Sequence, residues 1–398
     1  MAENKEKKVL NVPNLRFPEF EGEWEESTIG KQFELYSGNT PTRINKELFN
    51  GTINWISSGE LKEHYIYSTK ERISQEAANN LKLLSVGTFV IAIYGLEAEG
   101  VRGTGSITQE PSTISQACMA FTPKGEITNE FLYSWYKKHG HVIGVKYAQG
   151  TKQQNLSYDI LEKFKISYPN VKEQDKLNLF FSLIDKRIST QNKIIDKLQS
   201  LIKGISNRLL YADNSMSIRI EEMLIERSER TKKNNQYEIL SSTVNGIFSQ
   251  RDYFSKDIAS DNNVGYKIIH LHDIVLSPQN LWMGNINFND KFDIGIVSPS
   301  YKVFSIADGF DKKYVAALLK THHALYNYML VSEQGASTVR RNLNYEAFEQ
   351  LVFKIPSLNK QQEIGHVISL LKSQLENANL LIKTYNSQKQ YLLRQMFI

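Results

Sequence analysis

An internal repeat constrains this chain more than any other feature of its sequence. The segment Asn155–Tyr158 reads Asn-Leu-Ser-Tyr, and Asn342–Tyr345 reads Asn-Leu-Asn-Tyr, at an offset of 187 positions. The same offset relates further pairs in the two halves: Pro169 and Pro356, Gln174 and Gln361, Ile184 and Leu371, Ile195 and Ile382. This period is too long for a solenoid, whose units span about 20 to 50 residues. The sequence therefore predicts two tandem units, each the size of a domain.

Matches farther upstream extend the repeat at slightly different offsets. Gln149-Gly150 corresponds to Gln334-Gly335, so the second copy carries two additional residues before its Asn-Leu pair. Val86–Val90 resembles Leu271–Val275. The repeat therefore includes loops and expected strands as well as the segments that follow them.

Each copy ends in a segment with the pattern of a long helix. Between Glu173 and Tyr211 there is no proline and a single glycine, Gly204. With Gln191 filling one gap, and Lys389 the corresponding gap in the second copy, apolar residues recur there at alternating steps of three and four, the pattern of a coiled-coil seam. The seam comprises Phe181, Ile184, Ile188, Ile195, Leu198, Ile202, Ile205 and Leu209, and its counterpart comprises Ile368, Leu371, Leu375, Ala378, Ile382, Tyr385, Leu392 and Met396. We predict two helices of about 40 residues, each roughly 60 Å long.

These two helices are expected to pair with each other as an antiparallel coiled coil. A duplicated chain whose ends are brought together has pseudo-two-fold symmetry, and that symmetry runs the helices in opposite directions. The alternative is that each helix packs only on its own domain. A strict repeat of about 3.5 residues suits that alternative poorly, because a one-sided globular helix follows a period of about 3.6.

The segments before the helices indicate α+β domains. Short runs rich in β-branched and aromatic residues, bounded by turn-forming residues, are expected to be strands. These strands are Thr52–Ile56, Thr88–Tyr94, Ala117–Phe121, Phe164–Tyr168, Lys267–Ile269, Asp273–Leu276 and Tyr301–Phe304. Helices are expected at Asn129–Lys146, Tyr158–Lys163 and Asp311–Val331. The expected boundaries are residues 1–14 for an N-terminal tail, 15–169 for the first domain, 170–213 for a central helix, 214–356 for the second domain and 357–398 for a C-terminal helix.

The sequence lacks the motifs that a DNA-modifying enzyme needs. It contains no Asn-Pro dipeptide, so the Asn/Asp-Pro-Pro-aromatic loop of amino-methyltransferases is missing, and it contains no Walker A loop. Gly100–Gly105 is rich in glycine but has the wrong spacing for a dinucleotide site, and it is interpreted as a turn beside a strand. The pairs His139/His141 and His322/His323 have no Cys partners or carboxylate cluster nearby, so no metal site is predicted. Binding is favoured over catalysis.

Charge and cysteine content bear on partners and compartment. The formal net charge of +5 permits nucleic-acid binding but does not require it, so we expect local basic patches or partners that share the contact with DNA. The single cysteine, Cys118, is expected in the core and suits a reducing cytosol. No apolar run reaches the roughly 18 residues of a membrane span. Met1–Lys8 is charged and unlike a secretory signal, so a cytoplasmic protein without a membrane partner is expected.

Several loops combine amides, hydroxyls and cations, the groups that read base edges and bind phosphates. In the first unit the candidate DNA-binding residues are Gly38, Asn39, Thr40, Arg43, Ser57, Ser58, Gln149, Thr151, Lys152, Gln153 and Gln154. In the second unit they are Gln279, Asn280, Trp282, Ser298, Ser300, Tyr301, Ser337, Thr338, Arg340 and Arg341. The neighbouring pair Arg340 and Arg341 suits phosphate contact or guanine recognition. The alternative for every loop is an ordinary surface connection.

Five sequence motifs together resemble the specificity subunits of type I restriction–modification enzymes. They are Leu15–Phe20 followed by Trp24, Gly38–Pro41 leading to Ile53–Leu61, the Gly-x-x-x-x-Asn-Leu-Ser loop at Gly150–Ser157, the Pro-x-x-x-x-Gln helix starts at Pro169 and Pro356, and the ending Tyr391–Phe397. The resemblance covers nearly the whole chain. No single motif is specific, but their order and duplication are.

The resemblance implies a non-catalytic DNA reader. Each target-recognition domain reads one half of a split site in double-stranded DNA through the major groove, and the paired helices set the spacing. The helices also dock two methyltransferase subunits, through which restriction and translocase subunits join the complex. This chain needs no cofactor of its own; S-adenosylmethionine, ATP and Mg belong to the partner subunits.

The second domain departs from the first. It lacks the Trp-Ile-Ser-Ser-Gly-Glu-Leu segment and has Gly295–Tyr301 instead. We therefore expect two unlike half-sites, and hence an asymmetric target with half-site centres roughly one duplex turn, about 34 Å, apart. Two alternatives remain open: a stand-alone DNA-binding regulator, which the modest charge disfavours, and a coiled-coil scaffold, which leaves the two Gln-Gly loops without a role.

Overall fold

The computed structural model describes residues 10–98, 100–150, 154–209, 216–253, 262–334 and 341–398. The chain divides into two compact units: the first comprises Met1–Asn192 with Leu380–Ile398, and the second comprises Lys193–Asn379. Each unit therefore holds one mixed α/β body together with parts of the two long helices, α5 (Val171–Leu209) and α11 (Leu358–Met396). The two predicted long helices are confirmed.

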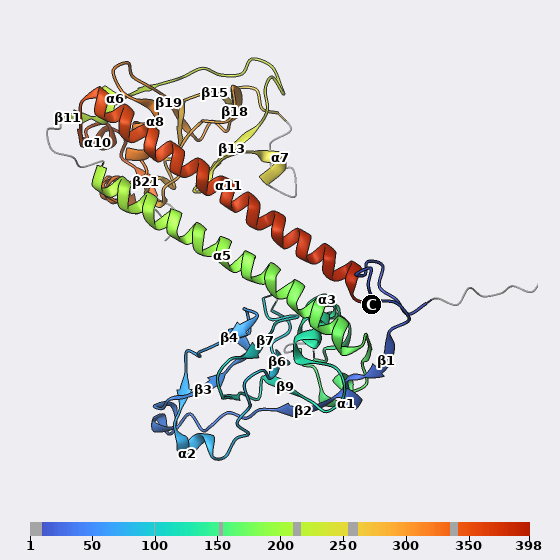
Figure 1. Cartoon of the computed structure of the whole chain (residues 1–398). Coiled ribbons are helices and arrows are strands. Elements are labelled where there is room, and N and C mark those ends of the chain that lie inside the picture. Colours follow the sequence, from blue (N-terminus) through green and yellow to red (C-terminus); the bar gives the residue numbers. More distant parts are fainter. Residues whose placement is uncertain (1–9, 99, 151–153, 210–215, 254–261, 335–340) are drawn as a thin grey trace, which may run out of the picture. The chain divides into compact units, whose positions relative to one another are not determined.

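A five-stranded sheet forms the body of the first unit (Figure 1). Its order is β2-β9-β6-β7-β4, and all neighbours are antiparallel except β7 and β4. The strands are β2 (Phe33–Ser37), β9 (Cys118–Pro123), β6 (Phe89–Ala92), β7 (Gly105–Thr108) and β4 (Tyr65–Ile66). Every residue of β6 is buried, as its unbroken apolar run predicts for a central strand.

Smaller elements surround this sheet. A second sheet has the order β5-β3-β8, and a separate pair joins β1 to β10. The strands are β5 (Arg72–Ile73), β3 (Ile53–Ile56), β8 (Ser112–Ile114), β1 (Glu25–Thr28) and β10 (Lys165–Tyr168). The short helices are α1 (Ile29–Gln32), α2 (Gln75–Ala78), α4 (Tyr158–Leu161) and the 3-10 turns Lys46–Phe49 and Ser58–Glu60.

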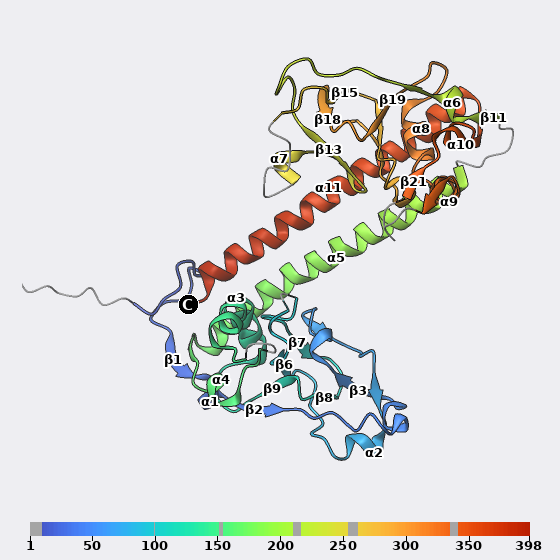
Figure 2. The same cartoon turned by 180° about the vertical axis from the view of Figure 1, so that it is seen from behind.

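Helix α3 (Asn129–Tyr147) lies between the sheet and the first half of α5 (Figure 2). It begins after Thr128, whose hydroxyl oxygen accepts a hydrogen bond from the Phe131 amide at 3.2 Å. Such a cap stabilises a helix by about 1 kcal/mol. The sheet-facing ring of Tyr136 packs on Phe89 of β6, with centroids 5.8 Å apart.

The last turns of α11 complete the core of the first unit. Leu393, Met396 and Phe397 are buried in the same apolar cluster as the sheet residues. The ring of Phe397 lies 5.1 Å from that of Phe131 and 5.6 Å from that of Phe181 on α5. A fully buried Phe contributes roughly 1.5–3 kcal/mol to stability. The last residues of the chain therefore stabilise the first unit, although most of that unit comes from the first half of the sequence.

The second unit repeats the central strand order of the first. Its antiparallel sheet β12-β19-β16-β17 corresponds to β2-β9-β6-β7, and its pair β11–β22 corresponds to β1–β10. These strands are β12 (Leu224–Glu226), β19 (Lys302–Ile306), β16 (Ile274–Leu276), β17 (Ile286–Phe288), β11 (Met216–Arg219) and β22 (Val352–Ile355). The predicted duplication is confirmed as a duplication of topology.

Three further strand pairs and several helices complete the second unit. The pairs are β13 (Leu240–Thr243) with β14 (Gly246–Ser249), β15 (Lys267–His270) with β18 (Ile294–Val297), and β20 (Ser332–Gln334) with β21 (Arg341–Leu343). The helices are α6 (Ile220–Met223), α7 (Gln250–Tyr253), α8 (Lys312–Leu318), α9 (His322–Leu330) and α10 (Tyr345–Glu349), with a 3-10 turn at Leu281–Met283.

The single helix predicted at Asp311–Val331 is wrong, because the structure has two helices there, α8 and α9. Thr321 separates them: its hydroxyl donates to the Leu318 carbonyl at 2.8 Å and accepts from the Ala324 amide at 3.2 Å. The same side chain thus ends one helix and caps the next. The predicted strand Thr88–Tyr94 is shorter than expected, because the chain turns at Gly95, whose φ is 75°.

A buried glutamine fixes the start of each long helix to its own unit. Gln174 donates to the Pro169 carbonyl at 2.9 Å, and its side-chain oxygen accepts from the Thr128 amide at 3.0 Å. Gln361, which is 187 positions later, donates to the Pro356 carbonyl at 2.9 Å and accepts from the Asp311 amide at 3.0 Å. The repeat therefore conserves one device, which joins the start of α5 to α3 and the start of α11 to α8.

The predicted seam residues face inward wherever their side chains are described. Phe181, Ile195, Ile368, Ala378 and Met396 are buried, and the other described seam positions are half-buried. Leu179 and Leu183, which lie off the seam, are 61% and 56% exposed. Within the first unit, Lys389 of α11 forms an ion pair with Asp185 of α5.

Candidate nucleic-acid interface

The candidate loops of the first unit gather at one end of its sheet. In the antiparallel register Ser37 at the end of β2 pairs with Met119 near the start of β9, and Ala92 at the end of β6 pairs with Cys118. Backbone hydrogen bonds then join successive loops: Asn39 to Ile114 at 3.1 Å, Ser115 to Ile56 at 2.9 Å, Ile93 to Ala117 at 2.9 Å and Leu96 to Gln154 at 3.1 Å. The structure thus brings the Gly38–Arg43 and Ser57–Ser58 candidates to one edge, together with Gln149 and Gln154.

The loop after β2 passes closely over its neighbours. A Cβ atom on Gly38 would lie 2.0 Å from the carbonyl oxygen of Ile114, so this position has no room for a side chain. The Asn39 side chain accepts from the Thr40 amide at 2.8 Å, and the Asn39 carbonyl accepts from the indole of Trp55 at 3.2 Å. These contacts fix the backbone conformation of the loop after β2.

Arg43 is the exposed cation of this loop. Its guanidinium forms two hydrogen bonds with Glu71, at 2.6 and 2.9 Å, and lies 4.4 Å from the centre of the Phe49 ring. The hydrogen bond from Arg43 lowers the pKa of the Glu71 carboxyl, so this pair is ionised at neutral pH. The Arg43 side chain is 56% exposed, which leaves its guanidinium accessible to a phosphate.

The two serines of the next loop have different surroundings. The amide and hydroxyl of Ser57 both donate to Glu60 at 2.9 Å, and Glu60 also accepts from the Lys70 amide at 2.7 Å. Ser57 therefore shapes the loop. Ser58 is half-buried in the 3-10 turn Ser58–Glu60.

The Gln149 loop is closed by paired backbone hydrogen bonds between Gln149 and Asn155, at 2.8 and 2.9 Å. Thr151, Lys152 and Gln153 lie outside the described residues. Gln154 contacts two residues that sequence reasoning missed: Arg102 donates to its side chain at 3.3 Å, and its amide donates to Glu97 at 2.9 Å. The glycines of Gly100–Gly105 predicted the turn that leads into β7, but they did not indicate that Arg102 contacts Gln154.

The second unit builds an equivalent arrangement. Strands β20 and β21 pair in the place of the Gln149 loop. The candidates Ser337, Thr338 and Arg340 lie outside the described residues. The Arg341 amide donates to the Gln279 carbonyl at 3.2 Å, and its guanidinium lies 4.9 Å from the centre of the Trp282 ring. The Asn280 carbonyl accepts from the Met283 amide at 3.1 Å. The structure therefore brings together Gln279, Asn280, Trp282 and Arg341.

The turn between β18 and β19 lies at the same end of this sheet, because Lys302 pairs with Leu276. Its hydroxyls Ser298 and Ser300 lie 3.0 Å apart and are accessible. Tyr301 instead donates to the Ser242 carbonyl at 2.9 Å, and burial raises the pKa of its phenol. Tyr301 therefore anchors the turn.

A buried polar network supports these loops in the second unit, and sequence reasoning missed it. Asn287 donates to the Ser242 hydroxyl at 2.7 Å, and Ser242 donates to Asn285 at 3.0 Å. Lys320 donates to Asn287 at 2.6 Å, and burial together with the charge of Lys372 lowers the pKa of Lys320 to about 8. The alternating asparagines along β17 are the sequence signal that places these amides on one buried face.

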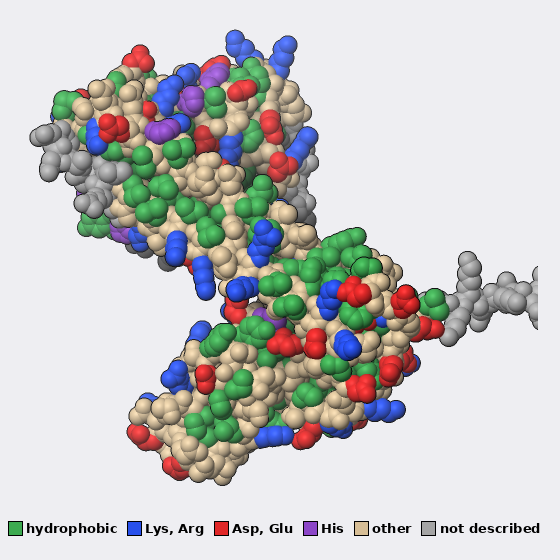
Figure 3. All heavy atoms as spheres, in the orientation of Figure 1, with side chains coloured by type: hydrophobic (Ala, Val, Ile, Leu, Met, Phe, Trp, Pro, Cys, Tyr) green, Lys and Arg blue, Asp and Glu red, His purple; other side chains and the backbone are tan. Residues whose placement is uncertain are grey.

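Charge and metal-binding groups are spread thinly over the parts that the structure describes. On the face drawn in Figure 3, Lys and Arg side chains are interspersed with Asp and Glu and do not gather into one broad field. The described residues contain no group of three or more His, Cys, Asp or Glu placed to hold a metal ion. Cys118 is buried, and burial raises the pKa of its thiol to about 12. None of the described helices combines the length and apolar character needed to cross a membrane.

Comparison with known proteins identifies the first half of the chain. Residues 21–200 match the family described as the type I restriction modification DNA specificity domain. These residues are therefore similar to a specificity domain. The match runs from just before β1 to Ser200 in the second half of α5, and so includes every candidate loop of the first unit. The resemblance to specificity subunits that the sequence predicted is confirmed.

Two curated proteins are each similar to a little under half of this chain. The type I restriction enzyme EcoR124I/EcoR124II specificity subunit of Escherichia coli is 29% identical over 189 residues, which cover 46% of this chain and 45% of the relative. The type I restriction enzyme MjaIX specificity subunit of Methanocaldococcus jannaschii is 27% identical over 185 residues, covering 44% and 42%. The matched part thus spans less than half the length of each relative.

Solved structures extend the likeness to the fold of both units. The type I restriction–modification S subunit of M. genitalium matches with a TM-score of 0.63 and 15% identity, covering 97% of this chain and 99% of that one. A chain from a structural study of complex assembly and conformational transition in the type I R-M system matches with a TM-score of 0.54 and 11% identity, covering 94% and 97%. The second unit therefore shares the fold of these S subunits, although its residues lie largely outside the specificity-domain match.

Proposed function

We propose that this chain is the DNA-reading specificity subunit of a type I restriction–modification complex, and that each unit reads one half of a bipartite target. One observation carries the proposal. In the first unit the Gln149 loop contacts the loop between β6 and β7, and in the second the β20–β21 pair contacts the corresponding loop between β16 and β17. In the first unit Gln154 lies on the loop of Glu97 and Arg102, and in the second Arg341 lies on the loop of Gln279 and Trp282. The names of the curated relatives agree with this role.

Gln154 in the first unit and Arg341 in the second occupy corresponding positions but differ in chemistry, and this supports two unlike half-sites. Gln154 presents an amide held by Arg102 beside the carboxylate of Glu97. Arg341 presents a guanidinium stacked on Trp282, and an arginine suits guanine or phosphate. A single palindromic target therefore does not suit these two surfaces.

The long helices supply the spacing in this proposal. Their inward-facing seam and the ion pair between Asp185 and Lys389 favour an antiparallel pair that holds the two half-sites about one duplex turn apart. The modest net charge and the interspersed surface charges favour partners that share the contact with DNA. We assign methylation and cleavage to separate methyltransferase and restriction subunits docked on the helices, with their own S-adenosylmethionine, ATP and Mg.

The test is selection of bound duplexes from a random library, with the chain in complex with a candidate methyltransferase subunit. A split, asymmetric motif is expected. Arg341→Ala should relax one half of the motif and Arg102→Ala the other, each by about 10- to 100-fold, the discrimination of one good base contact. Lys313→Ala is the matched control, because this exposed lysine on α8 lies beside Phe288 and His272, at the opposite end of the sheet from the hairpin.

Other outcomes distinguish the alternatives. Equal relaxation of both halves, or a palindromic motif, contradicts the assignment of one half-site to each unit. Undiminished selection without the methyltransferase subunit favours a stand-alone regulator. No selected motif under either condition favours a scaffold.

A further inference from the structure

His64 lies at the junction of the first domain with the long helices. It immediately precedes β4, and its ring is stacked between Tyr65 and Tyr133 of α3, with centroids 4.0 and 3.9 Å apart and interplanar angles of 9° and 2°. Only 8% of its side chain is exposed. The ring is therefore held in one plane, which fixes where its two nitrogens point.

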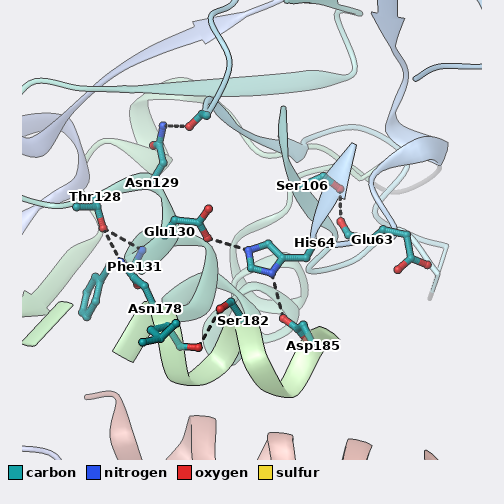
Figure 4. A network of polar contacts seen from close by, with 12 residues as sticks. Glu63, His64, Ser106, Thr128, Asn129, Glu130, Phe131, Asn178, Ser182 and Asp185 are labelled. Carbon is teal, nitrogen blue, oxygen red and sulfur yellow. Dashed lines mark hydrogen bonds and ion pairs between the residues drawn. The ribbon is translucent and has the colours of Figure 1, made fainter. Parts of the chain in front are cut away.

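Each ring nitrogen of His64 faces a carboxylate from a different helix (Figure 4). Nε2 lies 2.9 Å from Glu130 of α3, and Nδ1 lies 3.2 Å from Asp185 of α5. The second contact has the distance of an ion pair but not the angle of a hydrogen bond. A neutral imidazole has one N–H, so in either tautomer one nitrogen lone pair would face a carboxylate. The imidazolium has two N–H groups and suits both neighbours.

The network continues into α11. Lys389 forms an ion pair with the other oxygen of Asp185, so this carboxylate lies between a cation of α11 and the ring of His64. His64 thus connects to α11 through Asp185, and to the sheet through β4. Side chains from α3, α5, α11 and the segment before β4 therefore meet within a single cluster of charges.

Further titratable groups face this cluster from every element packed on it. On the segment of His64 itself they are Glu63 and Tyr65, on α3 they are Glu130, Tyr133 and Lys137, on α5 Asp185, and on α11 Lys389. Burial and the charge of Lys389 lower the pKa of Lys137 to about 8. With His64 charged, Glu130 and Asp185 are balanced by His64 and Lys389.

We infer that His64 is a protonation-controlled positioning residue that, as an imidazolium, fastens α5 and the last turns of α11 to the first domain. Loss of its proton leaves a lone pair against a carboxylate and loosens that attachment. The inference concerns contacts within this chain and does not depend on the proposed function.

The direction of the pH dependence follows from the surroundings of the ring. Burial opposes the charge, but Asp185 and Glu130 outweigh it and raise the pKa of His64 above its ordinary value. A group whose pKa is raised by folding stabilises the fold below its unfolded pKa of about 6.5, and the stabilisation is lost as pH rises through the folded value. The attachment is therefore strongest in mildly acidic solution.

The test uses the full chain and two readouts. Histidine resonances are titrated by NMR, with His64 assigned by its loss in His64→Gln. Hydrogen-exchange protection of residues 380–396 is measured across pH, with intrinsic exchange rates removed. His141→Gln is the matched control, because His141 is an exposed histidine on α3.

His64 is expected to titrate above the ordinary histidine pKa of about 6.5, and Asp185→Asn is expected to lower the pKa of His64. Protection of residues 380–396 should fall with rising pH in the wild type and in His141→Gln, and should be low and independent of pH in His64→Gln. A His64 pKa at or below about 6.5, or a pKa that Asp185→Asn leaves unchanged, would overturn the inference. If His64→Gln does not fold, His64 is assigned through its backbone connectivities, and the titrations of the wild type and of Asp185→Asn then decide the question.

Discussion

Replacing the buried glutamines at the helix starts tests the packing of both units within one chain. Gln174 is fully buried and Gln361 is 3% exposed. Gln174 contacts the Thr128 amide and hydroxyl and the Glu126 and Pro169 carbonyls, whereas Gln361 contacts the Asp311 amide and the Pro356 carbonyl. Alanine leaves these buried groups without their partner, at a cost of about 1–3 kcal/mol for each group left unsatisfied.

We therefore expect Gln174→Ala to lower the free energy of unfolding of the first unit by about 3 kcal/mol or more, and Gln361→Ala to lower that of the second by about 2 kcal/mol. Urea unfolding measures the loss, and hydrogen exchange assigns it to a unit. Gln362→Ala, one exposed position beyond Gln361, should change stability by less than about 0.5 kcal/mol. The reasoning is refuted if either buried substitution costs no more than this control, or if the loss falls on the other unit.

Three further predictions concern single positions. Phe397→Ala removes a ring packed on Phe131 and Phe181 and should destabilise the first unit by about 3–5 kcal/mol, measured by thermal unfolding; an unchanged midpoint would mean that the end of α11 is not part of that core. Gly38→Ala places a Cβ 2.0 Å from a backbone oxygen, so DNA selection by the complex should lose the first half of the motif while the second half stays; retention of both halves would remove this loop from the interface. Raising salt from about 50 to 200 mM should weaken DNA binding by the wild-type complex more steeply than binding by Arg43→Ala, because that variant neutralises one phosphate fewer and releases one counterion fewer. Equal slopes of log binding constant against log salt concentration would place Arg43 away from phosphate.

The repeat in the sequence predicted much of the fold because its signals are local. The long helices follow from a regular apolar spacing, and the loops at Gln149 and Gln334 and the two helix starts follow from short motifs that recur in both halves. The helix break at Thr321 was missed, because a threonine inside an apolar pattern does not reveal that its hydroxyl caps the following turn.

The candidate site was predicted less completely, for a physical reason. Sequence composition located the hairpins and their neighbouring loops, but the Arg102–Gln154 contact joins residues 52 positions apart. The His64–Asp185 contact joins a residue just before β4 to one on α5 that lies far along the sequence. Such contacts depend on how elements pack, and no local pattern encodes them. Ser57 and Tyr301 resembled readers of DNA in composition, yet their polar groups hold their own loops in place.

The most direct test of the central claim is methylome sequencing of cells that express the candidate methyltransferase subunit with and without this chain. The account predicts methyladenine in one split, asymmetric motif, present only with the chain, with one half altered by Arg341→Ala and the other unchanged. Methylation that is independent of the chain, or a motif whose two halves change together, would contradict it.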